Sequence, residues 1–528
     1  MSEILREPVS DPDRAAREGT WNDLILADRM RVGGVAAVML KVGLIMIGVA
    51  GIAGWLALAL VHMNDRYMVG HGAGEWMALA RYANEGTLYP PLSDGVRFGG
   101  TRYMPLPIVV NAAAARLSGE HLASGKAVAM VLFAALLILV FIALRRLNCP
   151  IPLAVALTGL LPATNTGLLA GSTIGGDVLV VVLQLGALLA MNAAVRRQVP
   201  AAFAAAGMLS GLAITAKLTG FWSVLAVLSW SVFQRDRRGL LWFSIACGAV
   251  ASLTLGFVQW MSEGRFLTTF MTFAFAGTGG PVGWIRAPNQ FMLFGSRDIT
   301  AVWMVAPFAV AALLAARRLP ALTLYHHALG WSLLLTLVVF TDMGTGGNQL
   351  LDLAVLTILA VGSLASRLPR DGVHAVSLTT ALSFAVAWGG ITGIRGFVPD
   401  LRAALVSKRT GEVPPRHDPR PLATVLTPST TLLTDDPTIP VLLGQPPVVL
   451  DAFMLRRLDE VQPRLVDGLI ARIARHEFEY VALITPLEED DFWWQHYHFG
   501  LRIVEALRNA YVFDSFAEGY YLYRPRPG

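Results

Sequence analysis

The chain has 528 residues, of which 55% are hydrophobic and only 15% are charged. Soluble globular proteins carry about 25% charged residues. This composition and the mean hydropathy of +0.55 therefore exclude an ordinary soluble protein and indicate one that lies in a membrane. The formal net charge of +5 is modest, and we expect membrane lipids rather than nucleic acid as partners. The abundance of Ala, Gly and Arg indicates a GC-rich bacterial source.

The N-terminal segment and the two cysteines narrow the class further. Residues 1–35 are polar and charged, which is typical of a cytoplasmic tail and not of a cleavable signal peptide. Cys149 and Cys247 lie in or beside apolar runs. They support neither a disulfide framework nor a cysteine metal site.

Apolar runs alternate with short loops that contain Arg over residues 36–396. Arg29 and Arg31 precede the first run, so the positive-inside rule places the N-terminus in the cytoplasm. The alternation predicts a polytopic α-helical membrane domain whose eleven spans leave everything beyond about residue 397 outside. The predicted spans are 36–62, 126–144, 151–170, 178–195, two short helices within 201–233, 240–261, 300–316, 321–341, 350–366 and 373–394.

The C-terminal tail changes in character. Residues 397–425 are rich in Pro and Arg and are predicted to be a linker. Residues 426–528 are predicted to form a small extracytoplasmic α/β domain. Its strands would lie in TLLTDDPTIPVLLGQPPVVLD and FEYVALITP, with a helix in LVDGLIARIARHEF. HYH at 496–498 has no partner ligand at helical spacing, so we expect surface-exposed histidines and no metal site there.

The predicted topology gathers polar residues on the external side. That side comprises a first loop (about 63–125), a later loop (about 262–299) and several short turns. The charged and amide residues placed there are Asp65, His71, Glu75, Arg81, Arg97, Arg102, Asp177, Lys217, Arg286, Asn289, Asp342, Asn348 and Asp352. Charged groups beside a bilayer are read first as functional candidates.

These residue types suit transfer from a lipid-anchored phosphate. A carboxylate can take a proton from an attacking hydroxyl. Lys and Arg can bind a phosphate and stabilise the charge that grows on it. Two of the signals also have plain structural explanations. Asp177, in GGD, suits an acid at a helix N-terminus, and Lys217 suits a side chain that extends to the membrane interface.

Short motifs follow one another along this external side. GEWMALARYANEGTLYPP (74–91) is followed by YMPLP (103–107), GGD (175–177), GLAITAKLTG (211–220) and GGNQLLD (346–352). Their order resembles the GT-C superfamily of polyprenyl-phosphate-dependent glycosyltransferases, which includes aminoarabinose transferases and protein O-mannosyltransferases. The matching residues of the first loop are Glu75, Gly86, Leu88, Tyr89, Tyr103, Pro105 and Leu106.

The resemblance implies a GT-C fold, a polyprenyl-phosphate sugar as donor, and inversion at the anomeric carbon with an acid as general base. The acceptor would be a hydroxyl of a cell-envelope glycan, lipid or protein, and the location the bacterial inner membrane. Some relatives bind a divalent metal and others do not, and no cluster in this sequence demands one. The resemblance implies catalytic roles for Glu75, Asp177 and Asp65, and substrate contacts from Lys217, Arg286, Tyr89, Tyr103, Arg102, Asn348 and Asp352.

The identity of the base has two alternatives. Relatives often carry Asp directly after the first span, whereas this chain has Asp65 close to the span and Glu75 further along. The helix and the Gly-x-x-Tyr spacing favour Glu75. A plainer alternative is that residues 71–84 form a structural amphipathic helix on which Glu75 is merely solvated.

Two other functions compete with a glycosyltransferase. Transporters and lipid flippases typically show internal repeats and polar or broken helices near the bilayer midplane. Here the two halves show no repeat, and the charges gather at one face. A sensor or scaffold would not need eleven spans as an anchor. These features favour a membrane glycosyltransferase.

Overall fold

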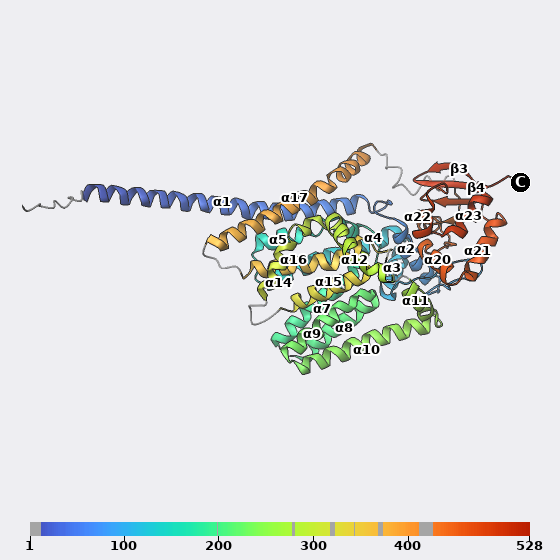
Figure 1. The fold of residues 1–528 in the computed structure, drawn as a ribbon, viewed down its shortest axis with the longest axis horizontal. Helices are drawn as coiled ribbons and strands as arrows, with labels where there is room; N and C mark the ends of the chain where they lie inside the picture. The colour runs from blue at the N-terminus through green and yellow to red at the C-terminus, as the bar shows by residue number, and fades with distance from the viewer. Residues whose placement is uncertain are drawn as a thin grey trace, which may run out of the picture.

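The chain folds into a bundle of apolar helices with a smaller α/β unit at one end (Figure 1). The structure is a computed structural model that describes residues 12–197, 199–276, 280–316, 323–342, 344–367, 373–410 and 426–527. The bundle and its loops contain α1 (Pro12–Val61), α2 (His71–Asn84), α3 (Pro105–Ser118), α4 (Leu122–Arg146), α5 (Ile151–Leu160), α6 (Asn165–Ser172), α7 (Asp177–Arg197), α8 (Pro200–Ala216), η1 (Leu218–Gly220), α9 (Phe221–Gln234), α10 (Arg237–Met261), α11 (Arg265–Ala276), α12 (Gly280–Asp298), α13 (Thr300–Trp303), α14 (Ala306–Ala316), α15 (Leu324–Val339), η2 (Gly347–Leu350), α16 (Leu351–Ala365) and α17 (Val373–Thr410).

Six helices in the described part of the chain are long and apolar enough to cross a membrane. They are Val35–Val61, Leu122–Arg146, Asp177–Arg196, Arg237–Met261, Gly347–Ala365 and Ser377–Val406. α5 and α6 add a seventh if this pair, bent by 76°, counts as one span. Three shorter apolar helices, in α8, η1 with α9, and α15, also belong to the bundle. The polytopic α-helical architecture is confirmed, and the count of eleven spans stays a prediction.

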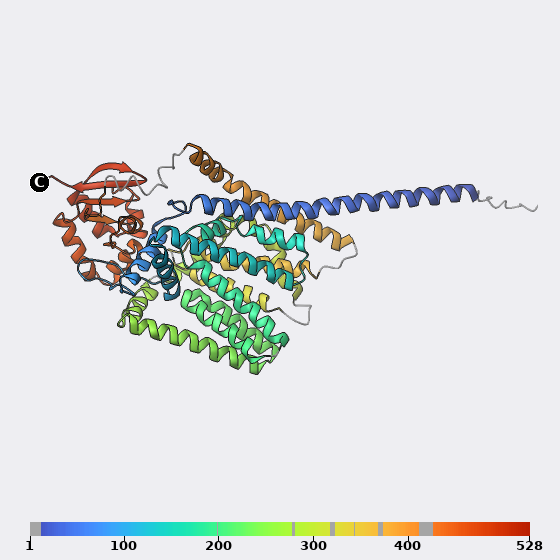
Figure 2. The same cartoon turned by 180° about the vertical axis from the view of Figure 1, so that it is seen from behind.

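Glycines let α1 and α5 pack with their backbones in contact. A Cβ on Gly48 would lie 2.4 Å from the Val155 carbonyl oxygen, and one on Gly159 would lie 2.4 Å from the Gly48 Cα. Small residues at such crossings are typical of helix pairs in membranes, where close backbone approach supplies the packing energy. α1 itself starts at Pro12, inside the predicted tail, and its first half extends beyond the other helices (Figure 2).

Two segments predicted as connections contain helices in the structure. Residues 262–299, predicted as a longer external loop, contain α11 and α12, and Pro288 lies inside α12; the external placement of this segment stays a prediction. The predicted linker begins as helix, because α17 continues through Pro399 to Thr410. The rest of that linker, 411–425, lies outside the described residues.

The C-terminal residues 426–527 form what we call the C-terminal unit. Its four-stranded sheet has the order β1 (Leu432–Thr434), β2 (Tyr480–Leu483), β4 (Tyr520–Pro525) and β3 (Tyr511–Ala517). β1 and β2 are parallel, and the other pairs are antiparallel. Its helices are α19 (Thr438–Leu442), α20 (Ala452–Val461), α21 (Arg464–Ala474), α22 (Asp491–His496) and α23 (Leu501–Ala510).

Some elements of this unit match the predictions and others differ from them. The predicted helix in LVDGLIARIARHEF is α21. The segment TIPVL, predicted to belong to a strand, is helix α19, and the hairpin of β3 and β4 was not predicted. The expectation of surface-exposed histidines is wrong here: His496 is half-buried, and His498 is buried with its Nδ1 3.0 Å from Asp435 Oδ2.

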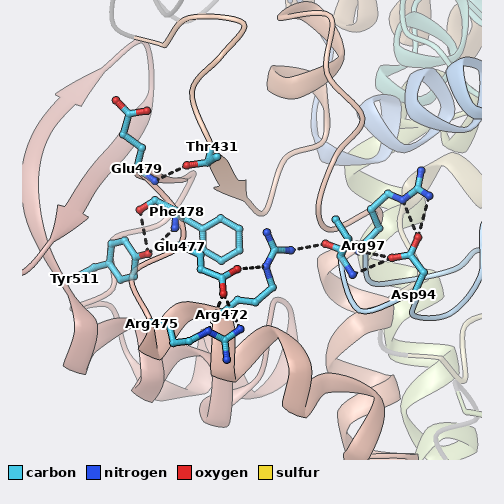
Figure 3. A network of polar contacts seen from close by, with 10 residues as sticks. Asp94, Arg97, Thr431, Arg472, Arg475, Glu477, Phe478, Glu479 and Tyr511 are labelled. Carbon is cyan, nitrogen blue, oxygen red and sulfur yellow. Dashed lines mark hydrogen bonds and ion pairs between the residues drawn. The ribbon is translucent and has the colours of Figure 1, made fainter.

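The first loop is joined to the C-terminal unit. The Phe98 amide donates to the Val448 carbonyl at 2.7 Å, and the Leu450 amide donates to the Phe98 carbonyl at 3.1 Å. Figure 3 shows the neighbouring contact, in which Arg472 of α21 binds Glu477 and also reaches the turn that holds Asp94 and Arg97. The first loop and the C-terminal unit therefore lie at the same end of the bundle.

Candidate functional site

Three segments far apart in the sequence bring Asp177, Lys217 and Asn348 together. They come from the start of α7, the C-terminal cap of α8 and η2. Lys217 Nζ forms an ion pair with Asp177 Oδ1, and Asn348 Nδ2 donates to Asp177 Oδ2 at 3.0 Å. Lys217 Nζ also donates to Gln349 Oε1 at 2.7 Å. We call these four residues the Asp177 cluster.

The local fold explains why these charges lie where they do. Asp177 begins α7, where the helix dipole favours an acid, and Lys217 ends α8, where it favours a base. Both simple structural explanations therefore hold in part, but the two charges are also turned toward one another. Each side chain keeps 24% of its surface exposed, so an incoming anion can reach the ammonium group.

Asp352 borders this cluster from the first turn of α16. Trp222 Nε1 donates to its Oδ2 at 3.0 Å, whereas its Oδ1 is buried without a hydrogen-bond partner among the described residues. The carboxyl group lies within electrostatic range of Lys217 and Asp177. The sequence-predicted set Asp177, Lys217, Asn348 and Asp352 is thus assembled in one place.

Glu75 lies in a second place, where α2 meets the C-terminal unit. Its side chain is only 4% exposed and accepts a hydrogen bond from the Tyr103 hydroxyl. A Cβ on the preceding Gly74 would lie 2.5 Å from the Thr438 amide nitrogen and 2.9 Å from Asp436 Oδ1. The plainer alternative of a solvated Glu75 is therefore wrong.

The surroundings of Glu75 contain more acid than base. Burial raises the pKa of Glu75 well above its usual value, and the nearby charge of Asp451 raises it further. The Tyr103 hydrogen bond and the charge of Arg102 oppose this shift without cancelling it. We call Glu75, Arg102, Tyr103, Asp436 and Asp451 the Glu75 cluster. Burial and the nearby acids therefore favour the protonated form of the Glu75 carboxyl group.

Trp76 connects the two clusters. Its ring stacks on Tyr103, with centroids 4.2 Å apart and an interplanar angle of 18°. A Cβ on Gly176 would lie 3.2 Å from the Trp76 ring, so the residue directly before Asp177 packs against this indole. The α2 helix therefore contacts the residue before Asp177 through Trp76 and the C-terminal unit through Gly74.

Asp65 is held in a different set of contacts. His62 Nδ1 lies 2.6 Å from its Oδ2, and the Tyr67 amide donates to its Oδ1 at 2.8 Å. Although burial alone would raise the pKa of Asp65, these hydrogen bonds hold it below its usual value. Lys126 Nζ lies 3.8 Å from Asp65 Oδ1 and donates to three backbone carbonyls of this turn. These contacts give Asp65 a role in fixing the end of α1.

The other predicted contacts divide between the two clusters or lie outside them. Arg102 Nη1 donates to Asp342 Oδ2 at 3.2 Å and its guanidinium lies over the Phe453 ring. Tyr89 is buried and its hydroxyl donates to the Tyr103 carbonyl at 2.7 Å, so it positions that segment. Arg286 lies on α12 and makes no hydrogen bond or ion pair with any residue that the structure describes.

Sequence reasoning missed four residues that complete these sites. Gln349 directly follows the predicted Asn348, so an amide pair was the available signal. Lys126 was detectable as a charge inside an apolar run. Asp436 and Asp451 had no signal, because they contact Glu75 only through the docking of a unit more than 350 residues later in the chain.

The residues of the Asp177 cluster do not suit a divalent metal. Within the described ranges, no three His, Cys, Asp or Glu side chains gather as a metal site. Both Asp177 oxygens are occupied by Lys217 and Asn348, and a lysine ammonium repels a cation. No chemical step is therefore assigned to a metal here.

Comparisons with known proteins identify the fold. No family model matches the sequence, and no curated protein matches it either. Two solved structures of ArnT from Cupriavidus metallidurans are similar to the chain: one bound to undecaprenyl phosphate (TM-score 0.57, 14% identity) and one in the apo state (0.56, 15%). Each match covers 90% of this chain and 97% of that one.

A third structure extends the comparison. The oligosaccharyltransferase of Archaeoglobus fulgidus in complex with Zn and sulfate has a TM-score of 0.50 at 13% identity, over 90% of this chain and 73% of that chain. ArnT and this oligosaccharyltransferase are both GT-C glycosyltransferases. The chain therefore has the GT-C fold, which confirms the resemblance of its motifs at the level of the fold.

Proposed function

We propose that this protein is a membrane glycosyltransferase that moves a sugar from a polyprenyl-phosphate donor to an acceptor hydroxyl on the extracytoplasmic face. The observation that carries the proposal is the Asp177 cluster, a lysine, an acid and two amides gathered at one end of a GT-C fold. The ArnT neighbour was solved with undecaprenyl phosphate, which supports a lipid phosphate as the ligand class.

Lys217 is proposed to bind the donor phosphate. As the bond between the anomeric carbon and the phosphate oxygen breaks, its electron pair stays on the phosphate, and a nearby ammonium stabilises that growing charge. In the unliganded cluster this ammonium is neutralised by Asp177, so the incoming phosphate would share or replace that ion pair. Asn348 and Gln349 are amides that can hydrogen-bond to either partner during this exchange.

Glu75 is proposed as the general base, with a condition that the structure imposes. A base must be ionised, whereas burial and the nearby Asp451 raise the pKa of Glu75 and disfavour its ionised form when α2 is docked on the C-terminal unit. Ionisation then requires a pH above the raised pKa, or a loosening of the contact with Asp451 and Asp436 when the acceptor binds. The ionised carboxylate takes the acceptor proton while the acceptor oxygen attacks the anomeric carbon from the face opposite the phosphate, which inverts that carbon.

The topology is part of the proposal. The first loop and the C-terminal unit are hydrogen-bonded to each other at one end of the bundle, and α4, which follows the first loop, ends at Arg145 and Arg146 at the other. The positive-inside rule then places the C-terminal unit outside the cell membrane. An alkaline phosphatase fused to the C-terminus should be active, and an active cytoplasmic reporter at the same place would contradict this orientation.

Transfer itself can be tested in membranes that contain the full chain. A panel of radiolabelled polyprenyl-phosphate sugars should reveal at least one donor whose label moves to membrane-bound or soluble acceptors. The double variant Asp177→Asn, Lys217→Ala should lose that transfer while it is still inserted. Equal transfer by the wild type and the double variant would overturn the proposal.

A further inference from the structure

A second basic site lies at the opposite end of the bundle from Asp177. A cavity of about 400 Å³ is lined by Arg146, Leu147, Asn192, Ala193, Arg196, Trp230, Gln234, Thr323, Leu324 and Tyr325. These residues come from the ends of α4, α7 and α9 and from the start of α15. A volume of this size is within the range of roughly 300–1,000 Å³ found for small-ligand pockets.

The length of α7 gives the distance between the Asp177 cluster and this cavity. α7 starts at Asp177 and continues for 21 residues to Arg197, one residue beyond Arg196. At about 1.5 Å per residue it is about 30 Å long, close to the thickness of the hydrocarbon core of a bilayer. The cavity therefore opens at the other membrane face, which the predicted topology assigns to the cytoplasm.

The charges of the cavity suit an anion. Arg146 and Arg196 both line it, and none of the ten described lining residues is acidic. Neither arginine forms an ion pair with a carboxylate in the described part of the chain. Tyr325 contributes a buried hydroxyl that lies within electrostatic range of both guanidinium groups. Two uncompensated cations around a buried hydroxyl form a site for a phosphate, which guanidinium groups bind through paired N–H donors.

The position of the cavity points to a lipid as the source of that phosphate. Arg146 and Arg196 end two helices that are long and apolar enough to span a membrane, so they lie at head-group depth. Leu147, Ala193 and Leu324 give the cavity apolar walls, and Trp230 is a residue type enriched at the membrane interface. Basic pockets between membrane helices on the cytoplasmic side are known to bind anionic head groups.

We propose that this cavity binds the phosphate of an anionic phospholipid in the leaflet opposite the transfer site. A zwitterionic lipid fits less well, because the cation of its head group would be repelled by the two guanidinium groups and would find no acidic side chain among the described lining residues. The proposal is independent of glycosyl transfer, since none of the lining residues belongs to the Asp177 or Glu75 cluster.

Native mass spectrometry of the purified full chain in detergent tests the site. Phosphatidylglycerol and phosphatidylcholine are titrated separately, and inorganic phosphate is added as a competitor. The wild type should retain phosphatidylglycerol at least tenfold better than phosphatidylcholine, and millimolar phosphate should not displace it. Arg146→Gln with Arg196→Gln should lose this preference. Arg237→Gln with Arg238→Gln removes the same charge from exposed residues outside the cavity and should keep it.

The Tyr325→Phe variant and the competition by inorganic phosphate complete the test. Tyr325→Phe keeps both arginines and should weaken phosphatidylglycerol binding several-fold, which checks the site even if the double variant folds poorly. Unchanged phosphatidylglycerol retention in both the double variant and Tyr325→Phe would overturn the site. Displacement of the lipid by millimolar inorganic phosphate would overturn the lipid as its ligand and reassign the cavity to a soluble phosphate.

Discussion

The Asp177 cluster and the Glu75 cluster differ in charge balance. In the first, one acid faces one lysine and two amides, and the charged groups keep part of their surface exposed. In the second, three carboxyl groups share one nearby arginine, and Glu75 is buried. An incoming anion can replace Asp177 as the partner of Lys217 in the balanced pair. Burial and the nearby acids instead favour the protonated form of Glu75. The difference assigns phosphate binding to the first cluster and proton transfer to the second.

The largest expected effect comes from Glu75→Gln. Gln keeps the size and the hydrogen-bonding capacity of Glu but is not an effective base, so turnover should fall by about 10²–10⁴-fold. Donor binding should persist, because Lys217 is untouched. The matched control is Glu85→Gln at the other end of α2, where the side chain is 43% exposed, and it should stay active. Nearly full turnover by the Glu75→Gln variant would show that the general base does not lie in the Glu75 cluster.

The stability of the same variant sharpens the comparison. The pKa of Glu75 is raised in the fold, so the folded state binds more protons than the unfolded state above pH 4.5, the ordinary pKa. Stability contributed by this group therefore falls as the pH rises toward the raised pKa. Gln does not titrate, so Glu75→Gln should melt at the same or a higher temperature than the wild type at pH 8. A clearly lower melting temperature would indicate a structural role instead.

The pH dependence of turnover is the next effect in size. Because Glu75 must lose its proton to act and its pKa is raised, the wild-type rate should rise with pH, by up to about tenfold per pH unit below the raised pKa. The rate is measured with a saturating donor between pH 6 and pH 9. Asp65 has a lowered pKa and is already ionised over this range, so a flat profile would favour Asp65 as the base.

A contact variant tests whether docking of the C-terminal unit controls Glu75. Gly74→Val places a side chain where a Cβ already meets the Thr438 amide nitrogen and Asp436 Oδ1, so α2 and α19 must separate. Overpacking of this kind costs about 1–3 kcal/mol. Gly72→Ala on the same helix is the control, since nothing lies within 4 Å of its Cβ position. Limited proteolysis should release the C-terminal unit faster from Gly74→Val, and equal rates would refute the contact.

The smallest effect is expected from Asp65→Asn. Asn keeps an oxygen for the Tyr67 amide but removes the charge that faces His62 and Lys126. Turnover should fall by less than about tenfold, because Asp65 is not the proposed base. The loss of its hydrogen bonds should instead lower the free energy of unfolding, by about 1–3 kcal/mol. A dead but fully stable Asp65→Asn protein would show that the first loop had been aligned incorrectly.

The same comparison shows what the sequence could predict. The Asp177 cluster was predictable because helix ends fix its members: Asp177 follows a Gly-Gly turn and Lys217 interrupts an apolar run, so both lie at one membrane face. The helix at 71–84 was predictable from its pattern and its Tyr-Pro-Pro end.

The environment of Glu75 was not predictable, because it depends on the docking of a unit far along the chain. The same is true of His498, which is buried against Asp435, although its local sequence is that of an exposed segment. The helices within residues 262–299 were not predicted either. Gly and Pro disfavour helices locally, but α12 forms with Pro288 inside it.

The central claim is that the Asp177 cluster binds the donor phosphate, and Lys217 tests it most directly. Lys217→Ala and Arg286→Ala both remove one cation that the sequence placed on the external side, but only Lys217 contacts Asp177. Transfer from a radiolabelled polyprenyl-phosphate sugar is measured for both variants in membranes with equal amounts of inserted protein. We expect a loss of about 10²–10³-fold for Lys217→Ala and less than about tenfold for Arg286→Ala. Equal activity of Lys217→Ala and the wild type would contradict the central claim.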